Sequence, residues 1–475
     1  LIGLTRPYIS AHWIKQLQIA PIALNFYQHG YNILWPETDY SADRPGYIEI
    51  EFQLVTWLTA LLYPLFGVHE WVGRVVAITF SMVGLVLLYL LARRHLGLRP
   101  ATYALLFYAF APSSVYFSRV LMSEPAMLCL SIAVLYLFSR YMTTLRPSYW
   151  LGALLTGALA FLVKLPTVHL AIPLVYLAHR RYGWRLFARA ELWALAILAL
   201  LPALAYYWHA HQHIGREYFT VGVGFGGQMW FSPSHFLRPA GYSLMIDRFV
   251  KDHLTAVGVV LLVVGLLYRR GGPIRLRLFH WWFLATVLYM IVISGGNLRQ
   301  NYYQLPVLPA AAGLIGLGWT CLARVRHLRL ANSALIAVFL ILAVWGAQPL
   351  YKEYRPILEA AAALDALDPA RNKPVVIMPP GYGCLYYFRR PGWVGREAMG
   401  KPPAWVKSPA DVPGPRYIED RIERGARWAV YFKAPPNEAH PEIRRYLREH
   451  FATISNEKGF LIFDLSKRLG AGKAP

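Results

Sequence analysis

Residues 71–94 read WVGRVVAITFSMVGLVLLYLLARR, and they decide the class of fold. The run 71–92 carries one charged side chain, Arg74, and it ends directly in the pair Arg93 and Arg94. A helix needs ~20 consecutive apolar residues to cross a bilayer, and basic residues mark its cytoplasmic end. The stretch therefore predicts a transmembrane helix whose C-terminal end lies in the cytoplasm.

Similar apolar runs follow along most of the chain. They cover residues 100–117, 121–139, 149–164, 166–178, 191–209, 254–268, 279–294, 303–322 and 330–348. The run 166–178 is short, and we expect it to be tilted or partly re-entrant. Of the 475 residues, 56% are hydrophobic and 15% are charged, whereas a soluble domain has about 25% charged residues. The sequence therefore predicts a polytopic α-helical membrane protein, and it excludes a disordered chain, a coiled coil and a disulfide scaffold.

The basic residues predict the orientation of the helices. One set of alternate connections holds sixteen of them: Arg93, Arg94, Arg99, Arg140, Arg146, Arg180, Arg181, Arg185, Arg189, Arg269, Arg270, Arg275, Arg277, Arg324, Arg326 and Arg329. The short connections on the other side hold only Arg119, Lys164 and Arg299. The sixteen mark the cytoplasmic side. Because the net charge of +23 lies mainly in such loops, it indicates membrane topology and not a nucleic-acid partner.

Three domains follow from this topology. Residues 1–70 form a first outer loop with two interfacial helices, at 13–28 and 52–66. Residues 71–350 form the transmembrane domain, which includes an outer loop at 209–253. Residues 351–475 form an outer α/β domain with strands at 375–378, 428–432 and 460–465 and helices at 417–424 and 442–450. Since Leu1 starts on the outer side, we expect an earlier span before the numbered sequence, giving about eleven.

Acidic residues are scarce before residue 351, yet five of the eleven crowd into the first outer loop. They are Glu37, Asp39, Asp43, Glu49 and Glu51. Carboxylates near lipid are costly unless a cation or metal compensates them. The cluster is therefore either a general base, with or without a divalent metal on Asp39 and Asp43, or a solvated acidic loop in which Arg44 pairs with a neighbour.

Ionisable residues at the outer ends of the apolar runs form a second group of candidates. Glu124 either is functional or pairs with Arg119 across a helix turn. Lys164 either snorkels to the interface or holds an anionic lipid headgroup. Together with Arg119, Arg299 and Tyr302, Lys164 would suit a phosphate.

Five further motifs stand out: LNF (24–26), GYNILWP (30–36), PGYIEIEF (45–52), LFGVHEWVGR (65–74) and NYYQLPVLP (301–309). These motifs resemble those of the GT-C glycosyltransferases. The resemblance is strongest to glycosyltransferase family 39, the relatives of the protein O-mannosyltransferases and aminoarabinose transferases. The resemblance implies sugar transfer from a polyprenyl-phosphate donor on the outer face of a bacterial or archaeal plasma membrane. It also implies an inverting mechanism with an acidic base in the first loop.

Two positions depart from the family pattern. Many relatives carry an Asp, thought to be the base, where this chain has Gln18, and a His where it has Asn301. An amide cannot take up a proton. Either the base has moved into the acidic cluster, with Glu49 and Glu51 favoured because they precede the apolar helix, or the chain has lost activity and serves as an accessory subunit beside other membrane subunits. A transporter is disfavoured, because we find no inverted repeat and no charge in the middle of a span.

Overall fold

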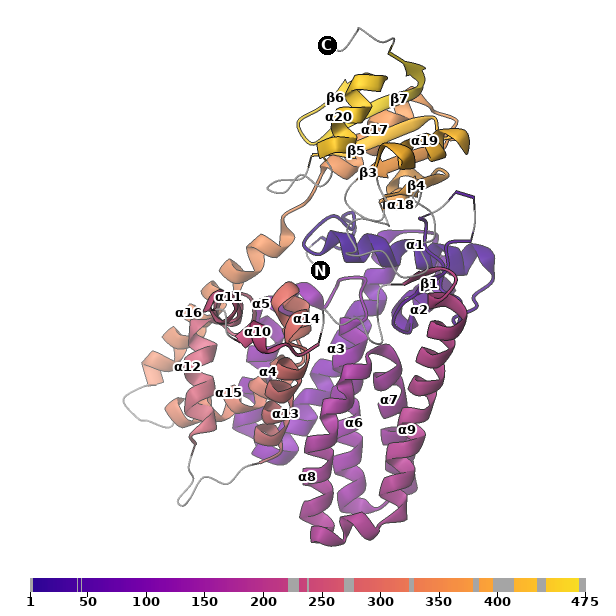
Figure 1. Cartoon of the computed structure of the whole chain (residues 1–475). Helices are drawn as coiled ribbons and strands as arrows, with labels where there is room; N and C mark the ends of the chain where they lie inside the picture. Colours follow the sequence, from indigo (N-terminus) through magenta and orange to yellow (C-terminus); the bar gives the residue numbers. More distant parts are fainter. Residues whose placement is uncertain are drawn as a thin grey trace.

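The computed structural model describes residues 3–40, 42–43, 45–220, 230–236, 239–268, 277–323, 329–378, 384–395, 414–433 and 441–469. Figure 1 shows a helical bundle, a layer of helices and loops across one end of it, and a sheet domain beyond that layer. Five arginines used in the topology prediction lie outside the described residues: Arg269, Arg270, Arg275, Arg324 and Arg326. So does Arg44, the expected partner in a solvated acidic loop.

The bundle contains the ten predicted apolar runs as helices. Its longer members are α3 (Glu70–Leu96), α4 (Leu98–Phe110), α5 (Pro112–Phe117), α6 (Glu124–Thr144), α7 (Pro147–Val163), α8 (Ala171–Tyr182), α9 (Ala190–His209), α12 (Thr255–Leu266), α13 (Leu278–Val292), α15 (Val307–Ala323) and α16 (Arg329–Ala347). The run 166–178 begins as the 3₁₀ turn η1 (Leu165–Leu170) before it continues as α8.

Short helices and turns connect the bundle at both ends. They are η2 (Gly183–Ala188), η3 (Ala210–Gly215), α10 (Pro233–Phe236), α11 (Pro239–Arg248), η4 (Phe249–His253), α14 (Ser294–Arg299), η5 (Asn301–Gln304) and η7 (Gln348–Tyr351).

Not every apolar helix is long enough to span a bilayer alone. Among the described residues, four helical stretches qualify by length and composition: Glu70–Leu96, Glu124–Thr144, Ala190–Gly215 and Asn332–Leu367. A bent pair, Ser243–His253 with Thr255–Leu266, would make a fifth. Helices such as α7 and α15 have 17 residues, or roughly 26 Å at 1.5 Å per residue, slightly less than a ~30 Å hydrocarbon core. Ten visible spans therefore stay a prediction.

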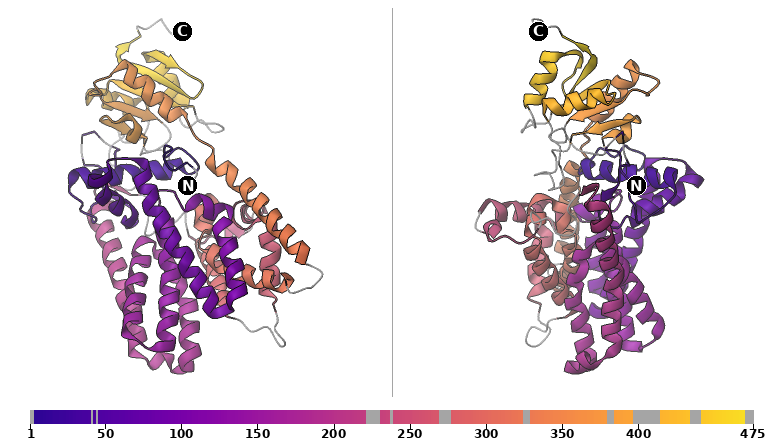
Figure 2. Two further views of the ribbon diagram at one scale, coloured as in Figure 1. Left: turned by 180° about the vertical axis from the view of Figure 1, so that it is seen from behind. Right: turned by 45° about the vertical axis from the view of Figure 1, so that its right-hand side comes forward.

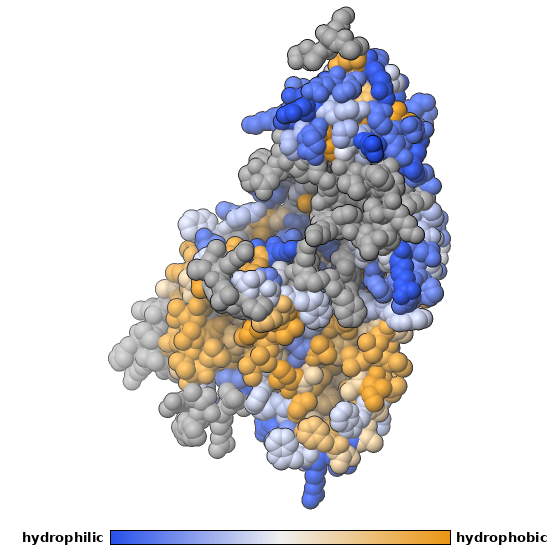
Figure 3. All heavy atoms as spheres, viewed as in Figure 1, coloured by the Kyte–Doolittle hydropathy of each residue, from blue (hydrophilic) through white to orange (hydrophobic). Residues whose placement is uncertain are grey.

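Apolar side chains cover the outside of the bundle. Figure 3 shows them as a broad band below the polar sheet domain. Exposed examples are Val86 on α3, Leu201 on α9, Val260 on α12 and Trp345 on α16. Water would penalise such a band, whereas lipid tails accept it. The chain is an integral membrane protein.

The layer above the bundle is built by the first loop. α1 (Trp13–His29) packs against α2 (Leu54–Phe66), and α1 ends at Gly30, whose φ of +111° is the left-handed conformation that glycine adopts easily. α1 buries Gln16, Gln18 and Asn25 together with its apolar residues. It is therefore covered on more than one face, whereas a helix lying freely at the interface would bury only its apolar stripe.

A short parallel pairing joins this layer to the chain that follows α9. β1 (Ile48–Glu49) pairs with β2 (Phe219–Thr220), so that Ile48 lies opposite Phe219. Residues that follow α9 are thereby placed beside the acidic part of the first loop.

The C-terminal domain is a five-stranded mixed sheet with helices. Its elements are α17 (Pro356–Leu367), β3 (Val375–Met378), α18 (Leu385–Phe388), β4 (Gly392–Val394), α19 (Pro415–Glu423), β5 (Trp428–Phe432), α20 (Pro441–His450), β6 (Phe451–Asn456) and β7 (Phe460–Arg468). The strand order is β4-β3-β5-β7-β6; β3 is parallel to β4 and β5, and β7 is antiparallel to β5 and β6. The three predicted strands are β3, β5 and the first part of β7, and β4 and β6 were not predicted.

This domain rests on the first loop. The side chain of Asp43 forms an ion pair with Arg424, which directly follows α19, and accepts a hydrogen bond of 3.0 Å from the Trp393 indole of β4. The backbone N–H of Val394 donates to the carbonyl oxygen of Tyr40 at 3.3 Å. Both views of Figure 2 show the sheet domain beyond the layer, with α16 rising toward it from the bundle.

Candidate active site

Lys15 and Glu51 meet where the first loop faces the bundle. Lys15 lies in the first turn of α1, and Glu51 follows β1. The Lys15 Nζ lies 3.0 Å from Glu51 Oε1, and the Ser123 hydroxyl donates to the same oxygen at 3.4 Å. Glu51 is buried, which by itself raises its pKa, but Lys15 and Lys164 together hold the pKa of this carboxyl below its usual value. Glu51 is therefore ionised at neutral pH.

A second ion pair lies beside the first. Glu124 opens α6 and is fully buried, and its Oε1 contacts the ammonium of Lys164, the residue that directly follows α7. The rings of Tyr302 and Tyr303 have their centroids 5.3 and 5.1 Å from the Lys164 Nζ, within the range of a cation–π contact. Since Ser123 precedes Glu124 and bonds to Glu51, the two pairs form one cluster. We call Lys15, Glu51, Glu124 and Lys164 the charged cluster.

The two lysines keep the capacity to bind an anion. Each lysine side chain is 16% exposed. An ammonium has three N–H donors, and in this cluster each lysine contacts a single carboxylate. Two cations that both act on the Glu51 carboxylate are suited to a phosphate.

Glu49 has a different partner from Glu51. It is buried, and its Oε1 lies 3.3 Å from Nδ1 of His211, in η3. Although the two glutamates are only two residues apart, one faces the second outer loop and the other faces α1 and α6. Glu51 alone of the two belongs to the charged cluster.

The two aspartates of the acidic loop are held separately. Asp39 accepts a 3.1 Å hydrogen bond from the amide of Asn25, and burial raises the pKa of its carboxyl above the usual value. Asp43 is bound to Arg424 and Trp393 in the contact with the sheet domain. Within the described ranges, no group of three or more His, Cys, Asp or Glu side chains is placed to hold a metal ion. The residues present do not make a metal site of the usual kind.

Gln18 lies one turn after Lys15 on α1, and residues three apart share a face of a helix. Its carbonyl oxygen accepts a hydrogen bond from the Thr38 hydroxyl at 3.2 Å. Its side-chain Nε2 is buried and has no hydrogen-bond partner among the described residues. A buried amide donor without a partner is costly, so this position can serve a bound substrate atom.

The two arginines predicted to bind phosphate have surroundings of their own in the described structure. Arg119 donates to the carbonyl oxygen of Gly3 at 3.1 Å and stacks 4.5 Å from the Tyr351 ring centroid. Arg299 is exposed at the end of α14. The contacts described for Lys164 and Glu124 include neither arginine.

A polar chain crosses the site at Asn301. Its Oδ1 lies 2.7 Å from Nε2 of His12, and its Nδ2 donates to Asp252 at 3.0 Å. The His12 ring packs edge-on against Tyr302 at 5.1 Å, and burial lowers the pKa of this imidazole. Asn301 therefore positions His12 and Tyr302 and needs no charge of its own to do so.

Sequence reasoning did not single out Lys15 or His12. A usable signal was present, because residues 1–350 contain only three lysines, Lys15, Lys164 and Lys251, among 27 basic residues. Arginine supplies nearly all the charge of the loops, whereas two of the three lysines meet at one glutamate.

Comparison with known proteins identifies the fold. Residues 53–208 match the family model described as dolichyl-phosphate-mannose-protein mannosyltransferase. No curated protein sequence matches the chain significantly. Among solved structures, ArnT from Cupriavidus metallidurans bound to undecaprenyl phosphate superposes with a TM-score of 0.66 at 15% identity, covering 97% of this chain and 95% of that one.

Two further structures are similar over most of this chain. The archaeal oligosaccharyltransferase AglB from Archaeoglobus fulgidus, in complex with an inhibitory peptide and a dolichol-phosphate, has a TM-score of 0.57 at 13% identity over 94% of this chain and 69% of that one. The arabinofuranosyltransferase AftD from mycobacteria has a TM-score of 0.56 at 17% identity over 98% of this chain and 39% of that one. The protein has the GT-C fold, and the predicted fold class and resemblance are confirmed.

Proposed function

We propose that the protein is a membrane glycosyltransferase that moves a sugar from a polyprenyl-phosphate donor to an acceptor on the outer face of the membrane. The charged cluster carries this proposal, because it offers two cations and an ionised carboxylate at the junction of the first loop and the bundle. Two proteins of the same fold were solved with an undecaprenyl phosphate and a dolichol-phosphate, which supports a lipid phosphate as the ligand.

Lys15 and Lys164 would hold the donor phosphate. They come from α1 and from the end of α7, so the phosphate would connect the first loop to the bundle while the isoprenoid chain lies in lipid. Their positive charge would also stabilise the polyprenyl phosphate as it leaves.

Glu51 would act as the general base. The acceptor hydroxyl oxygen attacks the anomeric carbon from the face opposite the phosphate, and the bond between that carbon and the phosphate oxygen breaks. The electron pair of that bond leaves with the polyprenyl phosphate, and the hydroxyl proton passes to Glu51. A donor phosphate bound to the two lysines would offset part of their positive charge. The pKa of Glu51 would then rise, and the carboxylate would become a better proton acceptor.

A transfer assay with a panel of polyprenyl-phosphate sugars tests this function, with wild type, Glu51→Gln and Gln18→Asp compared in the same membranes. Transfer by wild type that is lost in Glu51→Gln supports the proposal. Gln18→Asp should raise the transfer rate if a carboxylate on α1 acts as a base in addition to Glu51.

A second candidate function rests on Gln18. Its amide occupies the position where relatives carry an Asp, and it cannot accept a proton. The chain would then be a catalytically degenerate subunit of a membrane complex. The absence of transfer by both wild type and Gln18→Asp, in protein that still folds and binds undecaprenyl phosphate, would favour this function over the first.

The outer location of the cluster and of the sheet domain is part of the proposal. It rests on the asymmetry of basic residues between the two sets of loops. An Arg181→Cys variant should resist a membrane-impermeant thiol reagent in intact cells and react after the cells are opened. Labelling of this position in intact cells would reverse the proposed orientation.

A further inference from the structure

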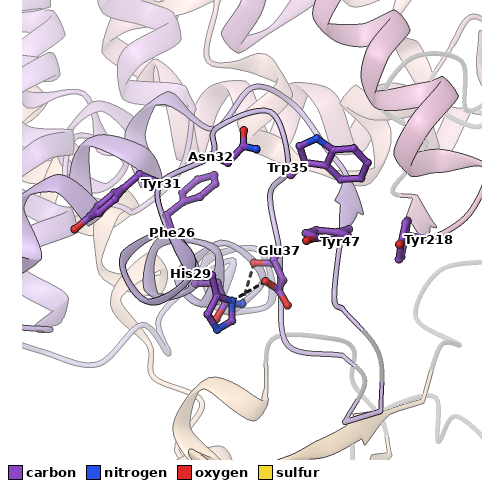
Figure 4. A pocket seen from close by; sticks show the side chains of 9 residues that line it. Phe26, His29, Tyr31, Asn32, Trp35, Glu37, Tyr47 and Tyr218 are labelled. Atoms are coloured by element: carbon purple, nitrogen blue, oxygen red, sulfur yellow. Dashed lines mark hydrogen bonds and ion pairs between the residues drawn. The ribbon is translucent and has the colours of Figure 1, made fainter.

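A cavity lies in the first loop, and none of the four residues of the charged cluster lines it. It has a volume of about 380 Å³ and is lined by Asn25, Phe26, His29, Tyr31, Asn32, Trp35, Glu37, Tyr47 and Tyr218. This volume falls within the roughly 300–1,000 Å³ of small-molecule pockets. Figure 4 shows Trp35, Tyr47 and Tyr218 gathered on one side, with His29 and Glu37 joined at another. We call this cavity the aromatic pocket.

The aromatic wall is built from two distant segments. Trp35 and Tyr47 pack edge to face at 5.1 Å, and Tyr47 packs in the same way against Tyr218 at 5.1 Å. Tyr218 comes from the chain after η3, and the pairing of β1 with β2 brings it to the first loop. An edge-to-face contact covers one face of only one of its two rings. The C–H faces of a sugar ring are the kind of surface that packs on the other ring faces.

Polar groups stand beside the rings. His29 Nδ1 lies 2.7 Å from Glu37 Oε2, and the other oxygen of Glu37 accepts a hydrogen bond from the Gly46 N–H at 3.3 Å. The side-chain amide of Asn25 donates to the backbone carbonyl oxygen of Glu37 and to the carboxylate of Asp39. Its side-chain oxygen remains as an acceptor. A fixed carboxylate, an imidazole and amides can together donate to and accept from the hydroxyl groups of a sugar.

The charge of the described lining disfavours a phosphate as the ligand of this pocket. None of its nine lining residues is Lys or Arg, and one is Glu37. The charged cluster, in contrast, contains two lysines. Asn25 lies seven residues after Gln18 on α1, and that spacing places both on one face at a separation of about 10 Å. The pocket is thus near the cluster and on the same side of the helix.

We propose that the aromatic pocket binds a neutral sugar ring of the acceptor, so that the acceptor is a glycan. This inference rests on the proposed function, because it assigns the second substrate of that reaction. The lipid phosphate would be held by charge in the cluster, and the acceptor glycan would be held by rings and hydroxyl contacts in the pocket.

Saturation-transfer NMR on the full-length protein in lipid nanodiscs tests the proposal, with a panel of neutral mono-, di- and trisaccharides as probes. Trp35→Ala and Tyr218→Ala should each weaken saccharide binding by roughly tenfold, since each removes one ring of the wall. Trp184→Ala is the matched control, because Trp184 is 77% exposed and lies in η2, outside the pocket. Binding of undecaprenyl phosphate, measured in the same samples, should be unchanged in all three variants.

Several outcomes would overturn the proposal. It fails if wild type binds none of the saccharides, or if Tyr218→Ala binds them as wild type does. Displacement of the saccharide by a polyprenyl-phosphate sugar, but not by undecaprenyl phosphate, would assign the pocket to the donor sugar and end the acceptor assignment. If Trp35→Ala does not fold, Tyr218→Ala decides.

The failure of the proposed function gives a different result. If the protein shows no transfer activity but its saccharide binding still depends on Trp35 and Tyr218, the sugar site is supported and the proposed function fails. A protein with transfer activity whose saccharide binding ignores both residues keeps the reaction and loses this site.

Discussion

The charged cluster and the aromatic pocket both border α1, yet they are built on opposite principles. The cluster holds two lysines and two glutamates in largely buried positions, where low dielectric strengthens each charge. The pocket has aromatic rings, amides and one histidine–carboxylate pair. In the proposed reaction the two substrates would need different chemistry, because a phosphate is recognised by charge and a neutral glycan by shape and hydroxyl contacts.

Glu51→Gln should give the largest effect and separate the cluster from the pocket. We expect transfer to fall by roughly 10²–10⁴-fold, the usual contribution of a general base, while saccharide binding is retained. The matched control is Glu49→Gln, which removes the negative charge beside His211 and leaves the cluster intact. Rates in reconstituted membranes check this. An equal loss in both variants would contradict the assignment of the base to Glu51.

Lys164→Met should weaken the binding of the lipid phosphate by about 1–3 kcal/mol, the range for a charge-assisted contact. Removing this lysine alone leaves Glu124 buried without a cation, which is destabilising. The double variant Lys164→Met with Glu124→Gln therefore separates binding from folding. Undecaprenyl phosphate binding and thermal unfolding measured together give the result. Full lipid binding by the double variant would show that Lys164 only compensates Glu124.

Lys15→Met should shift the pH dependence. Lys15 lowers the pKa of Glu51, so its removal should move the acidic limb of the transfer rate to higher pH. Removing Lys15 should also move the acidic loss of folding stability to higher pH. The fold favours ionised Glu51, so its contribution is present above the ordinary glutamate pKa and is lost as the pH falls through the lowered value. Lys251→Met, at an exposed pair with Asp247, is the control. Rate and unfolding profiles against pH would contradict the prediction if both variants coincide with wild type.

Asp43→Ala should have the smallest effect. The pair with Arg424 is partly exposed on both sides, at 31% and 46%, and such pairs contribute about 0.2–1 kcal/mol. We expect a small loss of stability, unchanged lipid binding and transfer that does not respond to a chelator. A loss of transfer that Mg²⁺ or Mn²⁺ restores would instead support a metal on Asp39 and Asp43.

The amino-acid sequence determined the membrane bundle, the acidic character of the first loop and three of the five strands of the C-terminal sheet. Each follows from local patterns, since a run of apolar residues or an alternating strand carries its signal within about twenty residues. Lys164 and Glu124 were also recognisable one by one, because charges at the ends of spans are rare.

Only the tertiary structure decided which charges meet. Glu124 lies 40 residues before its partner Lys164, and Asp43 lies 381 residues before Arg424. No local pattern records such contacts, because they depend on how helices cross and on which loop closes over them. The sequence favoured Glu49 and Glu51 equally. The fold placed His211 beside Glu49 and Lys15 beside Glu51, because the two side chains meet different segments of the chain.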